Sequence, residues 1–431
     1  MLYDNLSVND RGHLEIAGFD ACDLAETFGT PLYLLDEDVV RANCRAYASA
    51  MQEFFPEGSA PLYAGKALCF RGIYPIIESE GMRADVVSPG EIYTALSAGF
   101  PAEKLYFHGS NKTDDDIAYA IREHVGTFVT DNRNELLVLN EKAGEAGIRQ
   151  KVLLRVTVGI DSHTLAAINT GKVDSQFGVA IETGQAEEFL QEALAAPNIE
   201  VIGFHSHIGS QIFESEPFCR QVDILLGFAD QMRRNLGFTA QILNLGGGFG
   251  VPYVESDPPL DIRARIAEIS EHLHASCGKL GFPLPVILME PGRSIVAAAG
   301  VTLYKAGGVK EIPGYRNYVS VDGGMTDNPR YALYQSSYTV LNASRMTEEA
   351  DYLCTVAGRC CESGDRIQED IRIPRPARGD VIAVLTTGAY NYAMSSNYNK
   401  VPRPALVILH DGEARLAVRR QTWEDLAACE L

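Results

Sequence analysis

Short apolar runs and longer amphipathic segments alternate along the chain from about residue 37 to residue 295. The apolar runs, which are rich in β-branched residues and predict strands, lie at 61–65, 84–88, 104–108, 126–130, 152–158, 201–207, 242–246 and 286–290. The segments with helical periodicity lie at 37–54, 69–80, 89–98, 113–123, 133–147, 183–195, 215–235 and 262–279. Eight strands that alternate with helices predict an α/β fold in which a parallel sheet closes into a (β/α)8 TIM-type barrel. An open, doubly wound sheet is the alternative.

The pattern changes after about residue 297, where strand-like runs follow one another without helices between them. These runs include 301–304, 318–321, 352–356, 381–385 and 405–409. They predict a second, mainly β domain with a sandwich-like or barrel-like sheet. The chain therefore divides into an N-terminal segment, 1–30, that joins the β domain, a barrel domain, 31–296, and a C-terminal β domain, 297–431.

The charge balance excludes two classes of partner. The chain of 431 residues has 37 Lys and Arg against 57 Asp and Glu, a net charge of -20. Nucleic acids and anionic membranes both require a basic surface, so neither is expected as a partner. The sequence has no run approaching the ~20 apolar residues of a membrane span, and its start lacks the pattern of a signal peptide. We expect a cytoplasmic protein.

Nine cysteines are scattered along the chain without C-x-x-C spacing. An odd number in a long chain argues against a disulfide framework, and the spacing predicts no metal site. Most of them are expected to be small core residues.

Two residue groups at predicted strand ends fit one kind of ligand. Lys66 follows the first barrel strand, where partial desolvation would let its amine form a Schiff base with an aldehyde. Taken alone, a lysine whose charge reaches solvent is the commoner interpretation. Gly246, Gly247 and Gly248 follow the seventh strand, at the usual phosphate seat of this barrel, although a flexible turn has the same composition.

The sixth and eighth strands add an aromatic ring and a carboxylate. His205 and His207 stand two apart and are expected on one face, with Ser210 close behind as a phosphate donor. Glu290 ends the eighth strand and needs a cationic partner, which is either Arg293 or the ring nitrogen of a cofactor. An amine, a phosphate cradle, a stacking ring and a carboxylate together are what pyridoxal 5'-phosphate requires.

Longer motifs carry a resemblance over nearly the whole chain. They are Tyr63-Ala64-Gly65-Lys66-Ala67, Asp85-Val86-Val87-Ser88-Pro89-Gly90-Glu91, His108-Gly109-Ser110-Asn111-Lys112, His205-Ser206-His207-Ile208-Gly209-Ser210-Gln211, Gly246-Gly247-Gly248-Phe249-Gly250, Glu290-Pro291-Gly292-Arg293-Ser294, Cys361-Glu362-Ser363-Gly364-Asp365, Gly388-Ala389-Tyr390 and Met394-Ser395-Ser396-Asn397-Tyr398-Asn399. With these motifs the chain resembles the diaminopimelate decarboxylases, pyridoxal-phosphate enzymes of the alanine-racemase-like barrel class. The resemblance implies a carboxy-lyase that converts meso-2,6-diaminopimelate to L-lysine and CO2, the last step of lysine biosynthesis.

The resemblance also implies a role for each matching residue. Lys66 would hold the cofactor, His207 would stack on its ring and Glu290 would pair with the ring nitrogen. The phosphate would be bound by Ser210, Gly246, Gly247 and Gly248, with Tyr390 near both phosphate and substrate.

The substrate contacts are implied in the same way. Arg293, Arg330 and Tyr334 match the family's clamp on the distal carboxylate of the substrate. Cys361, the implied proton donor, and Glu362, which would recognise the distal ammonium, match a pair that the family supplies from the partner subunit. The resemblance therefore implies a homodimer with shared active sites.

Three motifs depart from the family pattern. S-K-F-G reads Ser175-Gln176-Phe177-Gly178, R-P-A-L-Y reads Arg330-Tyr331-Ala332-Leu333-Tyr334, and H-T-H reads His163-Thr164-Leu165. All chemical groups that the reaction needs are kept. The stretch 160–175, between a strand and a helix, is a candidate lid.

Three alternatives stay open. A sibling decarboxylase of ornithine, lysine, arginine or carboxynorspermidine would need a different distal clamp. An alanine-racemase-type enzyme would place an arginine rather than Glu290 at the ring nitrogen. A non-catalytic protein that binds pyridoxal phosphate would be expected to lose Lys66 or the Cys361–Glu362 pair.

Overall fold

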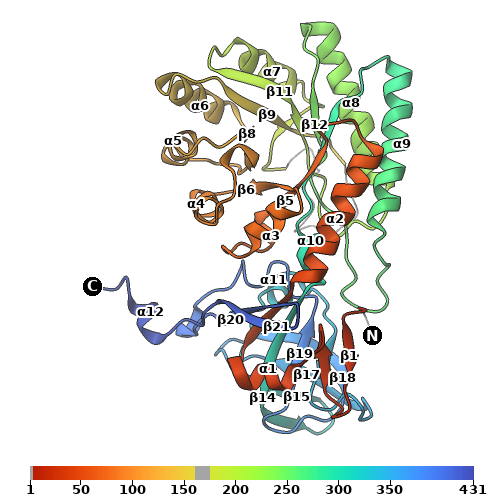
Figure 1. The fold of residues 1–431 in the computed structure, drawn as a ribbon, viewed down its shortest axis with the longest axis vertical. Helices are drawn as coiled ribbons and strands as arrows, with labels where there is room; N and C mark the ends of the chain where they lie inside the picture. Colours follow the sequence, from red (N-terminus) through yellow and green to blue (C-terminus); the bar gives the residue numbers. More distant parts are fainter. Residues whose placement is uncertain (1–2, 161–174) are drawn as a thin grey trace. The chain divides into compact units, whose positions relative to one another are not determined.

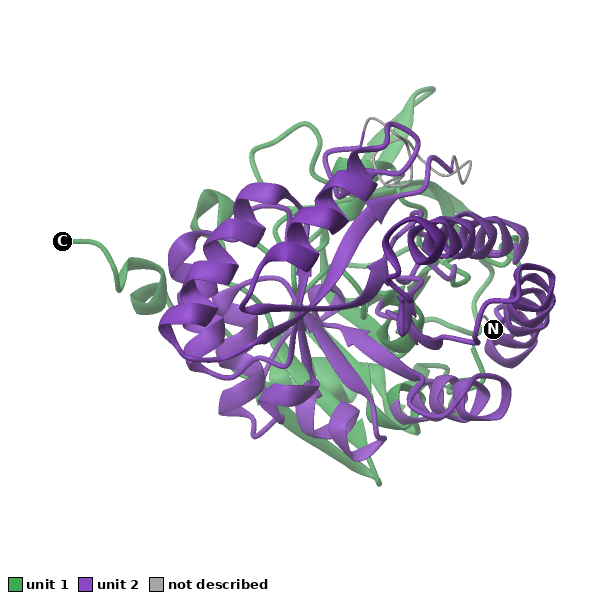
Figure 2. Ribbon diagram, turned by 90° about the horizontal axis from the view of Figure 1, so that it is seen from above, with its two compact units in different colours: residues 1–40, 251–259, 293–431 green, residues 41–250, 260–292 purple. Residues whose placement is uncertain are grey.

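The computed structural model describes residues 3–160 and 175–431, and the chain forms two compact units. Unit 1 comprises 1–40, 251–259 and 293–431, and unit 2 comprises 41–250 and 260–292. Figure 1 labels the elements, and Figure 2 colours unit 1 green and unit 2 purple. The motif His163-Thr164-Leu165 and nearly all of the candidate lid lie outside the described residues.

Unit 2 is built on a closed barrel of eight parallel strands. They are β5 (Ala60–Ala64), β6 (Arg83–Val86), β7 (Leu105–Phe107), β8 (Thr127–Thr130), β9 (Gln150–Thr157), β11 (Ile199–His205), β12 (Ile242–Asn244) and β13 (Val286–Met289). Pairing of β8 with β9 and of β13 with β5 closes the ring. A short strand, β10 (Val179–Ala180), adds to β9 outside the ring. The predicted barrel is confirmed and the open sheet is excluded.

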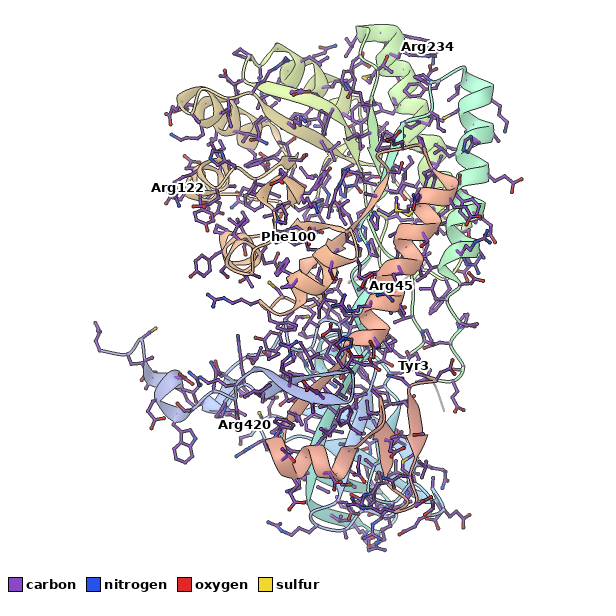
Figure 3. The ribbon with its side chains drawn as sticks, viewed as in Figure 1. Tyr3, Arg45, Phe100, Arg122, Arg234 and Arg420 are labelled. Carbon is purple, nitrogen blue, oxygen red and sulfur yellow. The ribbon has the colours of Figure 1, made fainter. Side chains whose placement is uncertain are left out.

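Helices surround the strands of this barrel, as the purple part of Figure 2 shows. They are α3 (Ile73–Ser79), α4 (Pro89–Ser97), α5 (Asp114–Arg122), α6 (Arg133–Glu145), α7 (Gln185–Ala195), α8 (Glu216–Leu236) and α9 (Ile262–Leu280), and α2 (Glu37–Phe54) precedes β5. The local sequence determines where several of these helices begin. Thr113 and Asp116 form a capping box on α5, and Ser88 caps α4 ahead of Pro89. Figure 3 shows charged Arg122 and Arg234 on the outer helices.

An apolar layer fills the interior of the barrel. Its members are buried side chains from six strands: Leu62, Tyr106, Val129, Leu153, Ile202 and Leu288. Burying a side chain of this size contributes ~1.5–3 kcal/mol each, so this layer holds the strands in register. The ends of the strands are thereby rigid supports for the loops that follow them.

Unit 1 contains a large, mostly antiparallel sheet. Its strands are β4 (Leu32–Asp36), β14 (Gly300–Ile312), β15 (Arg316–Val321), β16 (Val340–Asn342), β17 (Tyr352–Ala357), β18 (Arg366–Ile373), β19 (Val381–Leu385), β20 (Ala405–His410) and β21 (Glu413–Val418). β4, which the pattern did not predict, pairs with β14 and β20. The mainly β character predicted for the C-terminal region is confirmed.

The remaining elements of unit 1 are small. They are β1 (Leu6–Val8), β2 (Leu14–Ile16), β3 (Phe19–Asp20), α1 (Ala21–Phe28), α10 (Arg293–Val296), α11 (Arg330–Tyr334) and α12 (Trp423–Ala427). Leu14 and Ile16 belong to the same buried cluster as Leu303 and Val407, so the first strands share the apolar core of the large sheet.

Two general features bear on the sequence predictions. Within residues 3–160 and 175–431, every helix is too short or too polar to cross a membrane. All nine cysteines are free thiols, but only Cys44, Cys277 and Cys354 are buried. The expectation that most cysteines are core residues was therefore wrong: four of the others are half-buried, and Cys361 and Cys429 are exposed.

Candidate active site

The residues predicted in unit 2 follow the carboxyl ends of four barrel strands. Lys66 lies in a single turn, η1 (Gly65–Ala67), directly after β5, and Glu290 directly follows β13. His207 follows β11, and the three glycines begin two residues after β12. All of them therefore lie at one end of the barrel, where this fold carries its chemistry.

Two details of the sequence prediction were wrong. β11 ends at His205, so His207 lies in the loop and does not share a strand face with His205. Lys66 is exposed in the single chain, between buried Gly65 and Ala67, so its expected desolvation is not present. Its charge nevertheless lowers the pKa of His207, whose pKa is held well below the usual range first by burial and then by Lys66.

Glu290 is the centre of a buried polar cluster. Asn244 Nδ2 donates to Glu290 Oε1 at 2.7 Å. His108 Nε2 lies 2.9 Å from the same oxygen, and His205 Nε2 lies 3.2 Å from Oε2. The rings of His108 and His205 meet edge to face with their centroids 4.9 Å apart. The carboxylate is thus fixed from three strands.

The charges of this cluster follow from its surroundings. Burial alone would raise the pKa of Glu290, but His108 and His205 hold it well below the usual range, so the carboxylate is ionised. Burial lowers the pKa of His205 to about 4, against the attraction of Glu290, so this ring is neutral near pH 7. Burial also raises the pKa of Asp85, where the charge of Glu290 adds to the effect.

The loop after β12 brings bare backbone next to His207. Gly247 N–H donates to His207 Nδ1 at 3.3 Å, which places the proton of the neutral ring on Nε2. Gly246 has φ +66°, and a Cβ on Gly247 would lie 2.1 Å from the carbonyl oxygen of Glu290. Only glycine fits at Gly247, and the backbone of such a loop can come close to a phosphate.

Three residues of this region were missed by sequence reasoning. His108 and Asn244, which contact Glu290, were given no role, although His108 begins one of the family motifs and Asn244 stands two residues before the first glycine. Gln221 of α8 donates to the carbonyl oxygens of Ser206 at 3.1 Å and Leu245 at 2.9 Å. Gln221 thereby links the loops after β11 and β12. No sequence motif marks this residue, and its role is seen only from its burial in the structure.

The departure at Ser175-Gln176-Phe177-Gly178 falls on an exposed side chain. Gln176 is exposed, whereas the Phe177 ring lies 4.6 Å from the Arg155 guanidinium and Gly178 N–H donates to Asp131 at 3.0 Å. These contacts are made by Phe177 and Gly178, which match the family pattern, and not by Gln176, which departs from it.

Unit 1 gathers the predicted substrate residues into a cluster of two arginines and several tyrosines. Arg293 donates to Tyr253 Oη at 2.7 Å, and its guanidinium lies 4.8 Å from the Tyr390 ring. Arg330 lies 5.6 Å from the Tyr334 ring and 5.7 Å from the Tyr390 ring. Tyr253 was missed by sequence reasoning, since it stands in a connecting segment without a motif.

Arg330 carries an unsatisfied donor. Its side chain is buried, with 6% of the residue exposed, and it donates to Ser336 Oγ at 3.1 Å through one nitrogen. Among the described residues, its Nε finds no hydrogen-bond acceptor. A buried charged donor of this kind is costly unless a ligand supplies an acceptor, and a carboxylate fits the planar guanidinium best.

Cys361 and Glu362 occupy an exposed turn of unit 1. Cys361 N–H donates to Asn399 Oδ1 at 3.0 Å, and Tyr398 Oη donates to Glu362 Oε2 at 3.5 Å. Both predicted side chains are exposed in the single chain. The described structure therefore joins them to the Asn397–Asn399 motif and leaves them accessible.

Comparison with known proteins identifies the family. Residues 38–297 match the model of the pyridoxal-binding domain of pyridoxal-dependent decarboxylases. The chain is 44% identical to the diaminopimelate decarboxylase of Bacillus subtilis, over 98% of this chain and 96% of that protein. It is 40% identical to the Staphylococcus aureus enzyme of the same name, over 97% of each chain. The chain belongs to the diaminopimelate decarboxylase family.

Solved structures of the diaminopimelate decarboxylases have the same fold. The M. jannaschii enzyme, which has also been solved in complex with L-lysine, matches with a TM-score of 0.91 at 32% identity, covering 99% of this chain and 98% of that one. A Vibrio vulnificus lysine/ornithine decarboxylase matches less closely, with a TM-score of 0.77 at 25% identity over 94% of this chain and 99% of that chain.

The residues of unit 2 suit the cofactor of the diaminopimelate decarboxylases, pyridoxal 5'-phosphate. The ionised Glu290 offers a negative charge, and the glycine loop leaves room only for backbone beside a phosphate. Asp85 Oδ1 and His205 Nδ1 are buried without a hydrogen-bond partner among the described residues, as in a site shaped for a polar ligand. His108, His205 and Glu290 also present three ligand atoms within 4.8 Å of one another, a donor set that a divalent metal would accept.

Proposed function

We propose that this chain decarboxylates meso-2,6-diaminopimelate to L-lysine and CO2 with pyridoxal 5'-phosphate, as the last step of lysine biosynthesis. The observation that carries the substrate assignment is the buried Arg330, whose Nε has no acceptor among the described residues. A substrate with a second carboxylate would satisfy this donor. The similarity to named diaminopimelate decarboxylases over almost the whole chain supports the same assignment.

The cofactor residues are proposed by position and chemistry. When bound, pyridoxal phosphate supplies an electron sink that accepts the electrons of the scissile bond. Lys66 provides the amine that tethers its aldehyde, and Glu290 keeps the ring nitrogen protonated, for which an ionised carboxylate is required. His207, whose Nδ1 accepts from Gly247 N–H, would stack on the ring.

The phosphate is assigned to a second group of residues. Its binding residues are Ser210, Gly246, Gly247 and Gly248, with Tyr390 contributing its hydroxyl. The support is the glycine loop, in which side chains are excluded by the close carbonyl of Glu290. Gly246 N–H and Gly247 N–H already donate to Asn244 and His207, so the loop allows a close approach of the backbone, and the hydroxyls of Ser210 and Tyr390 supply the donors.

The substrate residues orient the bond that breaks. Arg330, Arg293 and Tyr334 bind the distal carboxylate, and Tyr390 borders both substrate and cofactor. Holding the far end of a flexible amino acid would restrict the rotation about its Cα and so fix the direction of the bond that breaks. Orientation of this kind lowers the activation barrier by several kcal/mol.

We further propose a homodimer in which Cys361 and Glu362 act in the site of the partner subunit. Cys361 would return a proton to Cα after CO2 leaves, and Glu362 would bind the distal ammonium. Their exposure in the single chain supports this role, since a catalytic thiol requires surroundings that another subunit can supply. A positioned acid contributes ~10²–10⁴-fold to such a step.

A cytoplasmic location is proposed on chemical grounds. All nine cysteines are free thiols, and two of them are exposed. Reducing compartments keep such thiols intact, whereas secreted proteins generally pair them.

Release of CO2 from a panel of amino acids tests the function. With cofactor added, we expect turnover of meso-diaminopimelate and at least ~100-fold lower kcat/KM for lysine, ornithine and arginine, which lack the distal carboxylate. Preference for lysine or ornithine would instead favour the sibling decarboxylases, the class to which the Vibrio vulnificus structure belongs.

A further inference from the structure

A cavity of about 640 Å³ opens in unit 2 at the end of the barrel away from the catalytic residues. Its lining includes the first residues of several strands: Arg83 of β6, Thr127 of β8, Gln150 of β9 and Ile242 of β12. Lys66 and Glu290 instead follow the last residues of their strands. In a parallel barrel these are opposite ends, so the cavity is separate from the proposed active site.

The lining is positively charged in a strongly acidic chain. It carries four cationic side chains, Arg83, Lys104, Arg149 and Lys151, against one acid, Glu103. The whole chain has a net charge of -20. Positive charge gathered inside a cavity of an otherwise negative protein gives a positive electrostatic potential there, which attracts anions.

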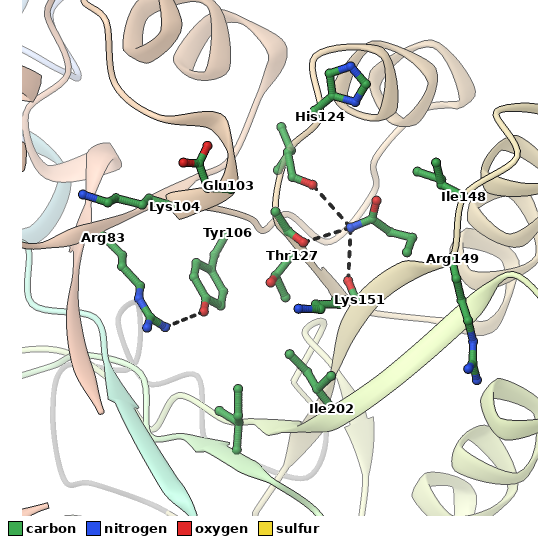
Figure 4. A pocket seen from close by; sticks show the side chains of 14 residues that line it. Arg83, Glu103, Lys104, Tyr106, His124, Thr127, Ile148, Arg149, Lys151 and Ile202 are labelled. Carbon is green, nitrogen blue, oxygen red and sulfur yellow. Dashed lines mark hydrogen bonds between the residues drawn. The ribbon is translucent and has the colours of Figure 1, made fainter. Parts of the chain in front are cut away.

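Two of these cations face the centre of the cavity. Figure 4 shows Lys151 pointing into the cavity from β9, and Arg83 reaching Tyr106, to which its Nη1 donates at 2.9 Å. Arg149 points away, with its Nε donating to the carbonyl oxygen of Ile199 at 3.1 Å. Lys104 is neutralised by Glu78 at 2.9 Å.

Buried hydroxyls and an apolar floor complete the lining. Tyr106 and Thr127 are 5% and 4% exposed. The Tyr106 oxygen accepts from Arg83, which leaves its hydrogen for an acceptor in the cavity. Ile202 and Ile242 form the floor, and Ile202 belongs to the apolar layer inside the barrel. Gln150 is held in place by three backbone carbonyl oxygens, including that of Gly126 at 3.1 Å.

We propose that this cavity is a second binding site, which takes a small organic anion with a carboxylate or phosphate head and a short apolar body. The head lies between Lys151 and Arg83 and accepts from the Tyr106 hydroxyl. The body lies on Ile202 and Ile242. Two cations with adjacent hydroxyl donors suit an anionic oxygen cluster, and the isoleucines favour a ligand larger than an inorganic ion.

Calorimetric titration of the holoenzyme with benzoate, phenyl phosphate and inorganic phosphate tests the site. We expect benzoate or phenyl phosphate to bind, the stronger of the two identifying the head group, and inorganic phosphate to bind more weakly. The Lys151→Gln change should weaken binding by about tenfold, because it removes a charged donor. The matched Arg149→Gln change removes the same charge from a side chain that points away, and should alter affinity less than about twofold.

Two further variants distinguish binding in this cavity from binding in the proposed active site. Tyr106→Phe, which keeps the ring in the apolar layer, should also weaken binding. Arg330→Ala should leave it unchanged, because Arg330 belongs to the proposed substrate clamp. The proposal is overturned if the wild-type protein binds neither organic anion, if Lys151→Gln and Arg149→Gln behave alike, or if Arg330→Ala abolishes binding. Inorganic phosphate that binds as tightly as phenyl phosphate would also overturn it, since the apolar floor would then have no role.

Discussion

The side-chain amide of Asn244 makes two hydrogen bonds that join Glu290 to the glycine loop. Its Nδ2 donates to Glu290 at 2.7 Å, and its Oδ1 accepts from Gly246 N–H at 2.9 Å. The neighbouring strands β12 and β13 thus hold the proposed ring-nitrogen carboxylate and the start of the glycine loop in a fixed relation. One buried amide couples the acidic group to the proposed phosphate cradle.

Replacing Asn244 should therefore weaken cofactor binding and the fold together. In Asn244→Asp a second carboxylate would face Glu290, which raises the pKa of that pair and weakens its hold on a protonated ring nitrogen. We expect cofactor affinity to fall at least ~10-fold, and the free energy of unfolding to fall by ~1–3 kcal/mol. Cofactor titration by absorbance and urea unfolding measure the two effects.

Asn235→Asp is the matched control for this change. Asn235 also donates to a carboxylate, Glu187, at 3.2 Å, but on the exposed surface of α8. It should leave both quantities unchanged. Equal behaviour of the two variants would contradict the role given to Asn244.

Lys66→Ala should abolish turnover and the covalent attachment of the cofactor. The proposed attachment uses the Lys66 amine at this strand end, so borohydride treatment of the variant should trap no cofactor on the chain. Mass spectrometry after reduction checks this directly. Lys112→Ala is a poor control, because Lys112 forms a buried ion pair with Glu135 at 2.8 Å. Lys142→Ala is suitable, because Lys142 pairs with an exposed carboxylate, Glu145, on α6. A labelled chain in Lys66→Ala would refute the assignment.

Arg330→Ala should raise the KM for meso-diaminopimelate by about 100-fold or more, because a bidentate charged contact is lost. The KM for lysine or ornithine, which lack the distal carboxylate, should change far less. Steady-state kinetics on all three substrates measure the difference. Equal effects on every substrate would mean that Arg330 supports the local structure rather than the distal carboxylate.

Mixing two inactive variants tests the shared site. A heterodimer of Lys66→Ala and Cys361→Ala chains has one site with both Lys66 and Cys361, so about half of the wild-type activity per dimer should return. Differently tagged subunits allow the heterodimer to be isolated before the assay. A verified heterodimer without activity would rule out the sharing of sites between subunits.

Glu91 should make stability depend on pH near neutrality. Burial and then the charge of Asp85 raise the pKa of Glu91 to about 7, against an ordinary 4.5. The folded state thus favours the protonated acid. The contribution of Glu91 to the free energy of unfolding is therefore full below about pH 4.5 and is lost as the pH rises through 7. In the wild type, the free energy of unfolding should therefore fall by about 1–3 kcal/mol between pH 5 and 8. In Glu91→Gln this fall should be absent or much smaller.

Chemical unfolding at several pH values measures this effect. Glutamine keeps an acceptor for the Val87 N–H, which donates to Glu91 at 2.7 Å, so the comparison isolates the ionisation. Surface-exposed Glu141→Gln serves as the control. The same pH profile in wild type and Glu91→Gln would contradict the raised pKa.

Much of the fold was predictable from the sequence because strand and helix periodicities are local properties. Each of the eight barrel strands was found within a few residues, since buried parallel strands are nearly continuous apolar runs. β4 was missed because it runs directly into α2 at Glu37, so the pattern of apolar residues does not separate the strand from the helix. The end of β11 was misplaced because its pairing with β12 ends at His205, and the pattern along the chain does not show where strand pairing ends.

The sequence by itself determined the kinds of chemical group and the strand ends that carry them, because motif spacing and hydrophobic pattern are written along the chain. Only the tertiary structure decided which groups meet. Asn244, His108 and His205 come from strands far apart in the sequence, and closure of the barrel brings them onto Glu290. The same holds for the tyrosines around Arg330 and for the charged cavity at the strand starts, since burial and the neutralisation of charge depend on neighbours in space.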